Sequence, residues 1–336
     1  MEHASGAEEA VATVGGNGSA EEVEAVAEIA RQRQLIIQEI KKVIVGQDAV
    51  IEELLIALLA QGHCLLVGVP GLAKTLLVST LSDVLHLSFN RVQFTPDLMP
   101  SDITGIHYYN QHNGQFEFRP GPVISQVVLA DEINRATPRT QSALLEAMAE
   151  RQVTVDQDTV PLPAPFLVLA TQNPIELEGT FPLPEAQIDR FLLRLRLGYP
   201  TEDDETAMLE RFEDADPLGS LGPVASADDV LGIQALVRQV YIDPVLRNYL
   251  VQVIRATREH PDVELGASPR ATLGLYRCAQ ALAGIRGQEY VTPDDIKTLA
   301  TPALAHRIIL KSMARLRERS QESVVNEVLE AQTVPV

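Results

Sequence analysis

A glycine-containing loop that ends in a lysine and a threonine is the clearest chemical signal in the chain. The loop, residues 68–75, follows a short apolar run and opens a helical pattern. Glycines let backbone N–H groups point at phosphate oxygens, and the start of the following helix adds partial positive charge. We therefore expect Lys74 to bind the β- and γ-phosphates of a nucleotide and Thr75 to bind Mg²⁺. The residues predicted to contact the nucleotide here are Gly68, Val69, Pro70, Gly71, Leu72, Ala73, Lys74, Thr75 and Leu76.

The loop departs from the usual phosphate-loop pattern at one position. Ala73 stands where G-x-x-x-x-G-K-[ST] has its second glycine. A methyl group is acceptable there if the residue has ordinary helical dihedral angles. The chain has five lysines, and Lys74 is the only one between Lys42 and Lys297. The alternative, a Gly/Pro loop that merely enters a helix, does not explain why the lysine stands at this place.

Polar side chains also end two later apolar runs. Asp131 and Glu132 follow residues 127–130. A carboxylate at a strand end can hold Mg²⁺ through the ion's waters, which is the role predicted for Asp131, and Glu132 can act as the general base toward the attacking water. A strand-terminal cap is the alternative, which the upstream phosphate loop disfavours. Asn173 follows residues 166–171 and could hydrogen-bond the attacking water or the γ-phosphate, whereas a turn-initiating Asn-Pro pair is the plainer interpretation.

Short apolar runs alternate with helical patterns through the first 200 residues. This alternation predicts a parallel sheet with helices on both faces, and Asp48 is the expected N-cap of one helix. Two predicted hairpins interrupt it, one near 105–119 around Asn113-Gly114 and one near 151–160 around residues 156–158. Beyond residue 200 the strand signal fades, which favours a second, all-helical domain. Its predicted helices span 203–213, 227–240, 244–258, 269–283 and 293–307.

Length, charge and cysteine content limit the compartment and the partners. A chain of 336 residues favours two domains, and its net charge of −19 disfavours nucleic-acid binding through the overall field, although a local basic groove stays open. Cys64 and Cys278 have no metal-type spacing, so a reducing cytoplasm is expected. No apolar run approaches the roughly 18 residues of a membrane span, and no signal-peptide core opens the chain. Residues 1–28 lack Lys and Arg and are predicted to form an acidic disordered tail, although a helix could begin at Glu21.

Four motifs in this order are similar to those of the MoxR family of AAA+ ATPases. They read GVPGLAKT, LADEINRA, ATQNP and LPEAQIDRF, and the resemblance covers roughly residues 33–317. In that family an alanine at the position of Ala73 is ordinary. The roles that the resemblance implies are adenine contact for Val45, Gly46 and Gln47, a first sensor for Asn173, an arginine finger for Arg190, and a second sensor that contacts the nucleotide for Arg270.

The resemblance also implies the fold and its division. We expect a P-loop NTPase core of the AAA+ type, a parallel sheet with helices on both faces, followed by a smaller all-helical lid. The hairpin around Asn113 matches the insert in the second helix that defines the clade, and the hairpin around Gln157 matches the insert before the first sensor. The predicted segments are the tail 1–28, the core 29–198, the lid 199–320 and a C-terminal tail 321–336.

The residues by themselves leave several of these roles open. Gln47 could be a plain neighbour of a helix cap. Arg190 follows Glu185 and Asp189, so an intrachain surface salt bridge is the alternative to a finger. Arg270 stands in the first turn of a predicted helix, where a cation is unfavourable unless it faces an anion. Second-rank candidates for action across an interface are Arg135 and Arg139.

Two functional classes compete. The first is an ATP-driven remodelling machine, and a finger supplied by a neighbour requires a head-to-tail, closing ring. Six subunits, a von Willebrand factor A-type partner and protein clients are implied by the resemblance alone. The second is a nucleic-acid-dependent AAA+ motor or clamp, which the hairpins disfavour because Arg119 is the only Lys or Arg in the first and none follows Arg151 in the second. A nucleotide-gated scaffold without turnover is a third class, against which Glu132 argues.

Overall fold

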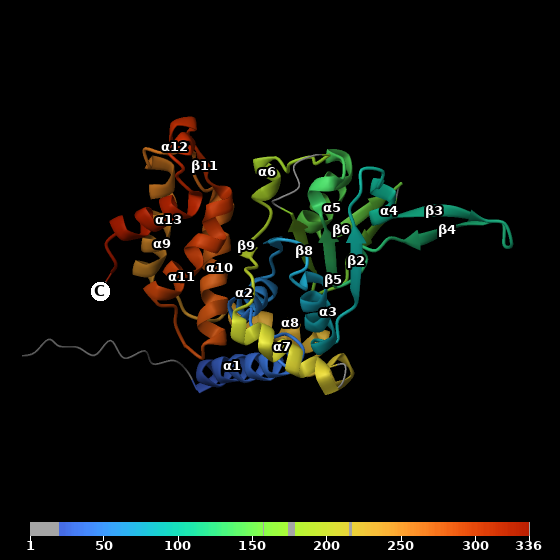
Figure 1. Ribbon diagram of the computed structural model, residues 1–336, viewed down its shortest axis with the longest axis horizontal. Helices are drawn as coiled ribbons and strands as arrows, with labels where there is room; N and C mark the ends of the chain where they lie inside the picture. The colour runs from blue at the N-terminus through green and yellow to red at the C-terminus, as the bar shows by residue number, and fades with distance from the viewer. Residues whose placement is uncertain (1–19, 157, 174–178, 215–216, 336) are drawn as a thin grey trace, which may run out of the picture.

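The computed structural model describes residues 20–156, 158–173, 179–214 and 217–335 (Figure 1). Its centre is a five-stranded parallel sheet with the strand order β2-β5-β8-β1-β9. The sheet has the all-parallel form that the alternating pattern predicts, and its middle strands are buried almost throughout, as in sheets covered on both faces. The strand bounds are β1 (Cys64–Val67), β2 (Phe89–Gln93), β5 (Val127–Asp131), β8 (Leu167–Gln172) and β9 (Leu193–Arg196).

Helices cover the two faces of the sheet and divide its side chains between two hydrophobic clusters. Alternate strand residues point to opposite faces, so Leu66 and Leu129 pack with one cluster, and Leu65 and Val128 with the other. The first cluster includes helices α1 (Ala20–Ile40), α2 (Asp48–Leu59) and α3 (Lys74–Val84). The second includes α4 (Pro100–Thr104) and α5 (Pro138–Glu150).

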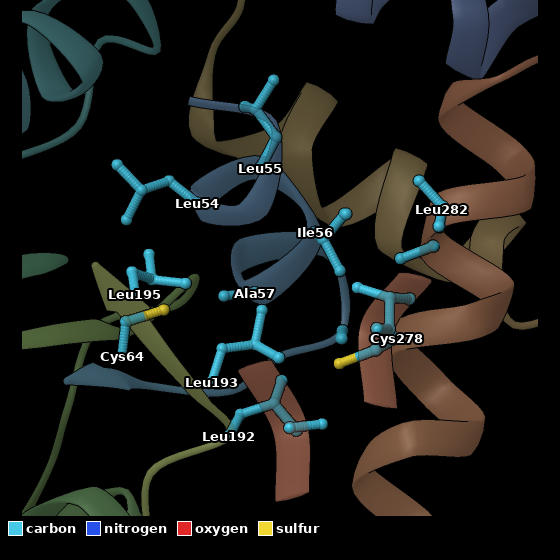
Figure 2. Close-up of a cluster of buried hydrophobic side chains, with 14 of the residues drawn as sticks. Leu54, Leu55, Ile56, Ala57, Cys64, Leu192, Leu193, Leu195, Cys278 and Leu282 are labelled. Atoms are coloured by element: carbon cyan, nitrogen blue, oxygen red, sulfur yellow. The ribbon is translucent and has the colours of Figure 1, made fainter. Parts of the chain in front are cut away.

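The lid follows β9 and shares the first hydrophobic cluster with the core. Figure 2 shows α2 between the sheet and α10 (Pro269–Ile285), with Ala57 near Cys64 and with Ile56 on the side of Cys278 and Leu282. The lid is therefore packed directly on the core. Its helices are α7 (Glu202–Asp214), α8 (Ala227–Val237), α9 (Pro244–Glu259), α10 (Pro269–Ile285), α11 (Pro293–Leu304), α12 (Ser312–Leu316) and α13 (Gln321–Ala331), with the 3₁₀ turns η2 (Pro217–Ser220) and η3 (Ala305–Arg307).

Both predicted hairpins are present, and they contact each other. One pairs β3 (Gly105–Asn110) with β4 (Gln115–Pro120), and the other pairs β6 (Gln152–Val155) with β7 (Asp158–Pro161). The first projects from the body of the molecule (Figure 1). His107 joins them, because its Nδ1 lies 3.1 Å from Asp156 Oδ2 and its Nε2 lies 3.2 Å from Asp158 Oδ2. No helix in the described part of the chain is long and apolar enough to cross a membrane.

Several predictions about local structure are wrong. The predicted C-terminal tail contains α13, whose Val324, Val325 and Val328 are buried, so this segment packs as part of the lid. The lid is not purely helical, because β10 (Val263–Leu265) pairs with β11 (Ile309–Leu310). Asp48 is the first residue of α2 rather than its N-cap, which is Gln47 at φ 58°. Helix α1 begins at Ala20, one residue before the helix start at Glu21 that the sequence allowed, so residues 20–28 are not disordered, and residues 1–19 lie outside the described ranges.

Candidate active site

The phosphate loop connects β1 to α3. Gly71 adopts φ +87° and nothing lies within 4 Å of the place where its Cβ would be, so the loop has an open side. Ala73 is the N-cap of α3 and is left-handed, with φ 52° and ψ 30°. The condition under which an alanine is unstrained here, ordinary helical dihedral angles, is therefore not met, and the left-handed conformation of Ala73 costs roughly 1–2 kcal/mol relative to a glycine.

The lysine of the loop is half-buried and lies among opposite charges. Lys74 Nζ donates a hydrogen bond to the Gly68 carbonyl oxygen. Burial lowers the pKa of Lys74, and the nearby charges of Asp131 and Glu132 act in the opposite direction. A desolvated ammonium group on the wall of a cavity is a strong partner for phosphate oxygens.

Two adjoining cavities meet at the loop. One, of about 430 Å³, is lined by the loop from Pro70 to Leu76 together with Asp131, Glu132, Thr171 and Asn173. The other, of about 520 Å³, shares the loop residues Pro70–Ala73 and Leu76 with it. After the ligand parts that the sequence predicts for them, we call them the phosphate cavity and the purine cavity, and the two together the nucleotide cleft. The second has a mostly apolar wall, and both have the size of small-molecule sites.

The purine cavity is built from parts of the chain that are far apart in sequence. Val45 and Gln47 line it from the turn between α1 and α2. Gly46, between them, is left-handed at φ +68°, and a Cβ there would come within 2.9 Å of Asp204 Oδ2. Sequence reasoning missed the opposite wall, which comes from the segment after β9 and from α7. The residues that it missed are Leu197, Tyr199, Pro200, Glu205, Met208 and Leu209.

The carboxylate predicted to bind the metal is oriented by two neighbours. Thr171 Oγ1 donates a 2.6 Å hydrogen bond to Asp131 Oδ1 from the adjacent strand β8. Arg91 Nη2, on β2, donates a 2.6 Å hydrogen bond to Asp131 Oδ2. A carboxylate has about four lone-pair positions, so these contacts orient Asp131 and leave it able to accept from the water of an ion. Thr75 and Asp131 both line the phosphate cavity, and both have side-chain oxygen atoms, which are the ligands that Mg²⁺ prefers.

The predicted base lies beside Asp131 in a strained backbone conformation. Glu132 has φ 57°, and its N–H donates to Thr171 Oγ1 over 2.8 Å. Gln93 Nε2 donates to Glu132 Oε2 over 2.8 Å, and Arg135 Nε lies 3.2 Å from the same oxygen. The carboxylate is therefore held between β2 and the turn η1 (Ile133–Arg135). Asn173, buried at the end of β8, lines the same cavity.

The two arginines predicted to act on phosphates line neither cavity. Arg270 Nη1, at the start of α10, lies 3.7 Å from Asp189 Oδ2. Asp189 follows α6 (Glu185–Ile188) and directly precedes Arg190, so the two arginines lie at one place on the protein. Within the described ranges the ion pairs of Asp189 go to the lid, and Arg190 forms none. Of the second-rank candidates, Arg135 contacts Glu132, and Arg139 is exposed at the start of α5.

Comparisons with known proteins agree with this architecture. Residues 63–193 match the model of the ATPase family associated with various cellular activities (AAA), and residues 255–328 match the AAA lid domain. The chain is 44% identical to the protein named Chaperone MoxR1 of Mycobacterium tuberculosis, over 89% of this chain and 81% of that one. It is 32% identical to Protein MoxR of Methylorubrum extorquens, over 89% and 93% of the two chains.

A solved structure extends the comparison to the fold. A crystal structure of a Cytophaga hutchinsonii protein assigned as an ATPase superposes with a TM-score of 0.88 at 43% sequence identity, covering 93% of this chain and 98% of that one. Sequence identity of this level over nearly the whole length joins core and lid in one family assignment. The chain belongs to the MoxR family of AAA+ ATPases, and it is an ATP-hydrolysing enzyme.

Proposed function

We propose that the chain works as a ring-shaped, Mg²⁺-dependent ATPase that uses hydrolysis to remodel or mature protein complexes. The observation that carries the proposal is that some of the predicted catalytic groups line the cavities of their own chain and others do not. Lys74, Asp131 and Glu132 surround the phosphate cavity of their own chain, whereas Arg190 and Arg270 lie outside both cavities. Arg91 and Arg135 contact the two carboxylates, but no arginine of the described residues lines either cavity, so a second copy of the chain supplies the arginine that acts on the phosphates.

Each residue of the cleft has a defined task in this proposal. Val45, Gly46 and Gln47 lie beside the adenine, the loop amides and Lys74 hold the phosphates, and Thr75 with Asp131 holds Mg²⁺. When bound, Mg²⁺ neutralises charge on the phosphate oxygens.

The other polar groups act on water and on the departing phosphate. Glu132 takes the proton of the attacking water, and Asn173 orients that water or the γ-phosphate. Arg190 and Arg270 of the adjacent subunit stabilise the charge that develops as the γ-phosphate leaves.

Supply of arginines from an adjacent subunit requires a head-to-tail interface, and such interfaces close into rings. We propose six subunits, protein clients, and a partner with a von Willebrand factor A-type domain, as the family resemblance implies. The relative named a chaperone supports the class of work. The buried free thiols Cys64 and Cys278 fit a reducing compartment such as the cytoplasm.

The experiment is capture of a client by protein that binds ATP and hydrolyses it slowly. Glu132→Gln protein with ATP should hold a protein client that the wild type releases, and Lys74→Ala protein, which lacks the phosphate contact, is the matched control. Particle mass measured in parallel should show the ring in the first sample. A result in which no protein is retained, while single-stranded DNA or RNA accelerates ATP turnover, would replace the chaperone with a nucleic-acid motor.

A further inference from the structure

The backbone around Arg190 is held by a buried arginine of the lid. Arg307, at the end of η3, has a side chain that is only 2% exposed. Its Nη2 donates a 2.7 Å hydrogen bond to the carbonyl oxygen of Phe191 and a longer one, 3.4 Å, to that of Asp189. These two carbonyl groups belong to the residues on either side of Arg190. The lid therefore hydrogen-bonds to the backbone immediately before and after the predicted finger Arg190.

The Asp189 carboxylate strengthens the same contact. Arg307 Nε lies 3.4 Å from Asp189 Oδ1, and Ser268 Oγ, just before α10, donates to the same carboxylate over 3.0–3.1 Å. A buried guanidinium is stable only when it is paired, so Asp189 and Arg307 depend on each other. We call the contacts among Asp189, Phe191, Ser268 and Arg307 the α6–lid joint.

Two further lid residues close around the joint. His306 Nε2 lies 3.0 Å from the Phe191 carbonyl oxygen, and burial lowers the pKa of His306 so that the ring is neutral and donates there. Gly274 of α10 approaches so closely that a Cβ would lie 2.9 Å from Leu192 Cδ1 and 3.3 Å from Arg307 Nη1. Residues 189, 191 and 192 are thus all fixed by the lid.

We infer that Arg307 is a positioning residue for Arg190: through the α6–lid joint it couples the lid of one subunit to ATP hydrolysis in the next. The inference rests on the proposed function, in which Arg190 acts on a neighbour's nucleotide. Arg307 touches no nucleotide; it sets the backbone from which Arg190 extends. Because catalytic geometry tolerates little displacement, with about 10²-fold at stake for a 1 Å shift, a tilt of the lid changes the rate in the neighbouring site.

A plain structural role is the competing account, and the two differ in which subunit carries the defect. A mixture of Lys74→Ala and Arg190→Ala chains provides the test. The Lys74→Ala chain is the donor, since it keeps Arg190, and the Arg190→Ala chain is the receiver, since it keeps the phosphate loop. Only the donor has an Arg190 for Arg307 to position.

The experiment adds Arg307→Gln to one chain at a time. In the donor it should lower kcat of the mixture by on the order of 10–10²-fold, with KM for ATP unchanged. In the receiver it should leave the mixture as active as the baseline. Equal losses from both placements, or no loss from the donor placement, would overturn the inference. A baseline mixture that stays inactive, although labelled subunits exchange, would instead remove the trans role of Arg190 and the inference with it.

Two further variants serve as controls for this experiment. Glu322→Gln removes another tie between core and lid, since Glu322 of α13 accepts hydrogen bonds from Arg194 and Arg196 on β9 and, among the described residues, forms no hydrogen bond or ion pair with the joint. The same donor-side loss from Glu322→Gln would mean that any loosened lid is sufficient, which contradicts a specific role for Arg307. If Arg307→Gln does not fold, Arg307→Lys keeps the buried charge and loses the paired carbonyl contacts, and the same donor-only defect is expected.

Discussion

The nucleotide cleft and the α6–lid joint are built in opposite ways. The phosphate cavity of the cleft gathers groups from the ends of neighbouring strands of one sheet, and each group lines a cavity of its own chain. The joint ties the segment around Arg190 to lid residues about 80 or more positions away, and its residues line neither half of the cleft. Under the proposed function, this chain holds the groups that bind ATP and activate water, and it presents the groups that stabilise the charge of the leaving phosphate to another copy.

The largest expected effect on turnover comes from Arg190, which lies in the segment held by the α6–lid joint. Arg190→Ala should lower kcat by about 10³–10⁵-fold, because a finger stabilises charge only in the transition state, and ATP affinity should stay near that of the wild type. Steady-state turnover and calorimetry with ATP and Mg²⁺ measure the two quantities. Arg255→Ala, at an exposed position of α9, is the matched control. A loss smaller than tenfold would return Arg190 to an ordinary surface role.

The next effect belongs to the cleft. Glu132→Gln should keep ATP binding and reduce kcat by about 10²–10⁴-fold, because the amide preserves the shape and the contact with Gln93 but has no basicity. Glu150→Gln, exposed at the end of α5, should leave turnover unchanged. Near-normal hydrolysis by Glu132→Gln protein would leave that residue as a strand cap.

A smaller effect separates binding from chemistry within the cleft. Lys74→Ala should weaken ATP binding by about 2–3 kcal/mol, because a half-buried, charge-assisted contact to phosphate is lost. Calorimetry checks it against Lys42→Ala, whose lysine pairs with Glu39 at the surface. Equal affinities for the two variants would mean that the phosphates lie elsewhere.

The smallest effect concerns stability and comes from two buried histidines, one in the core and one beside the α6–lid joint. His63, directly before β1, accepts from the Val168 N–H through Nδ1 and contacts the Met148 carbonyl oxygen through Nε2. Burial lowers the pKa of His63 from 6.5 to about 4. A lowered folded-state pKa gives stability that is fully present above pH 6.5 and is lost as the pH falls toward 4.

Between pH 7.5 and 5.5 this residue should therefore remove about 1 kcal/mol from the free energy of unfolding. His306 beside the joint, whose pKa also lies well below its usual value, changes stability in the same direction. Urea unfolding at the two pH values measures the loss, and His63→Gln should make the pH dependence shallower. An unchanged slope would show that His63 does not remain neutral in the folded chain.

Sequence reasoning found the groups that follow directly from local patterns. The phosphate loop, Asp131 and Asn173 each stand at the end of an apolar run, and parallel strands end at one edge of a sheet. Gln93 and Arg91 escaped it because their contacts depend on strand order: β2 lies next to β5, and no local pattern states which strands are neighbours.

The contacts of the lid were even harder to predict from local sequence patterns. The helical periodicities of α9 and α10 are visible in the sequence, but the burial of Arg307 against Asp189 is a tertiary contact between residues that look like surface ions. The contribution of α7 to the purine cavity was missed. Met208 and Leu209 belong to a helix whose sequence is rich in acidic residues, which is typical of an exposed helix. The backbone strain at Ala73 could not be predicted, because a residue type does not determine its dihedral angles.

The central claim, that a hydrolysing site is completed by a second copy of the chain, can be tested on the wild-type protein. Turnover per subunit and particle mass are measured across a dilution series, with ATP affinity determined at the lowest concentration by a bound fluorescent nucleotide. The account predicts that turnover per subunit falls as the assembly dissociates, while the dissociated chain still binds ATP through its own cleft. Full turnover per subunit from a chain shown by mass to be a monomer would contradict it.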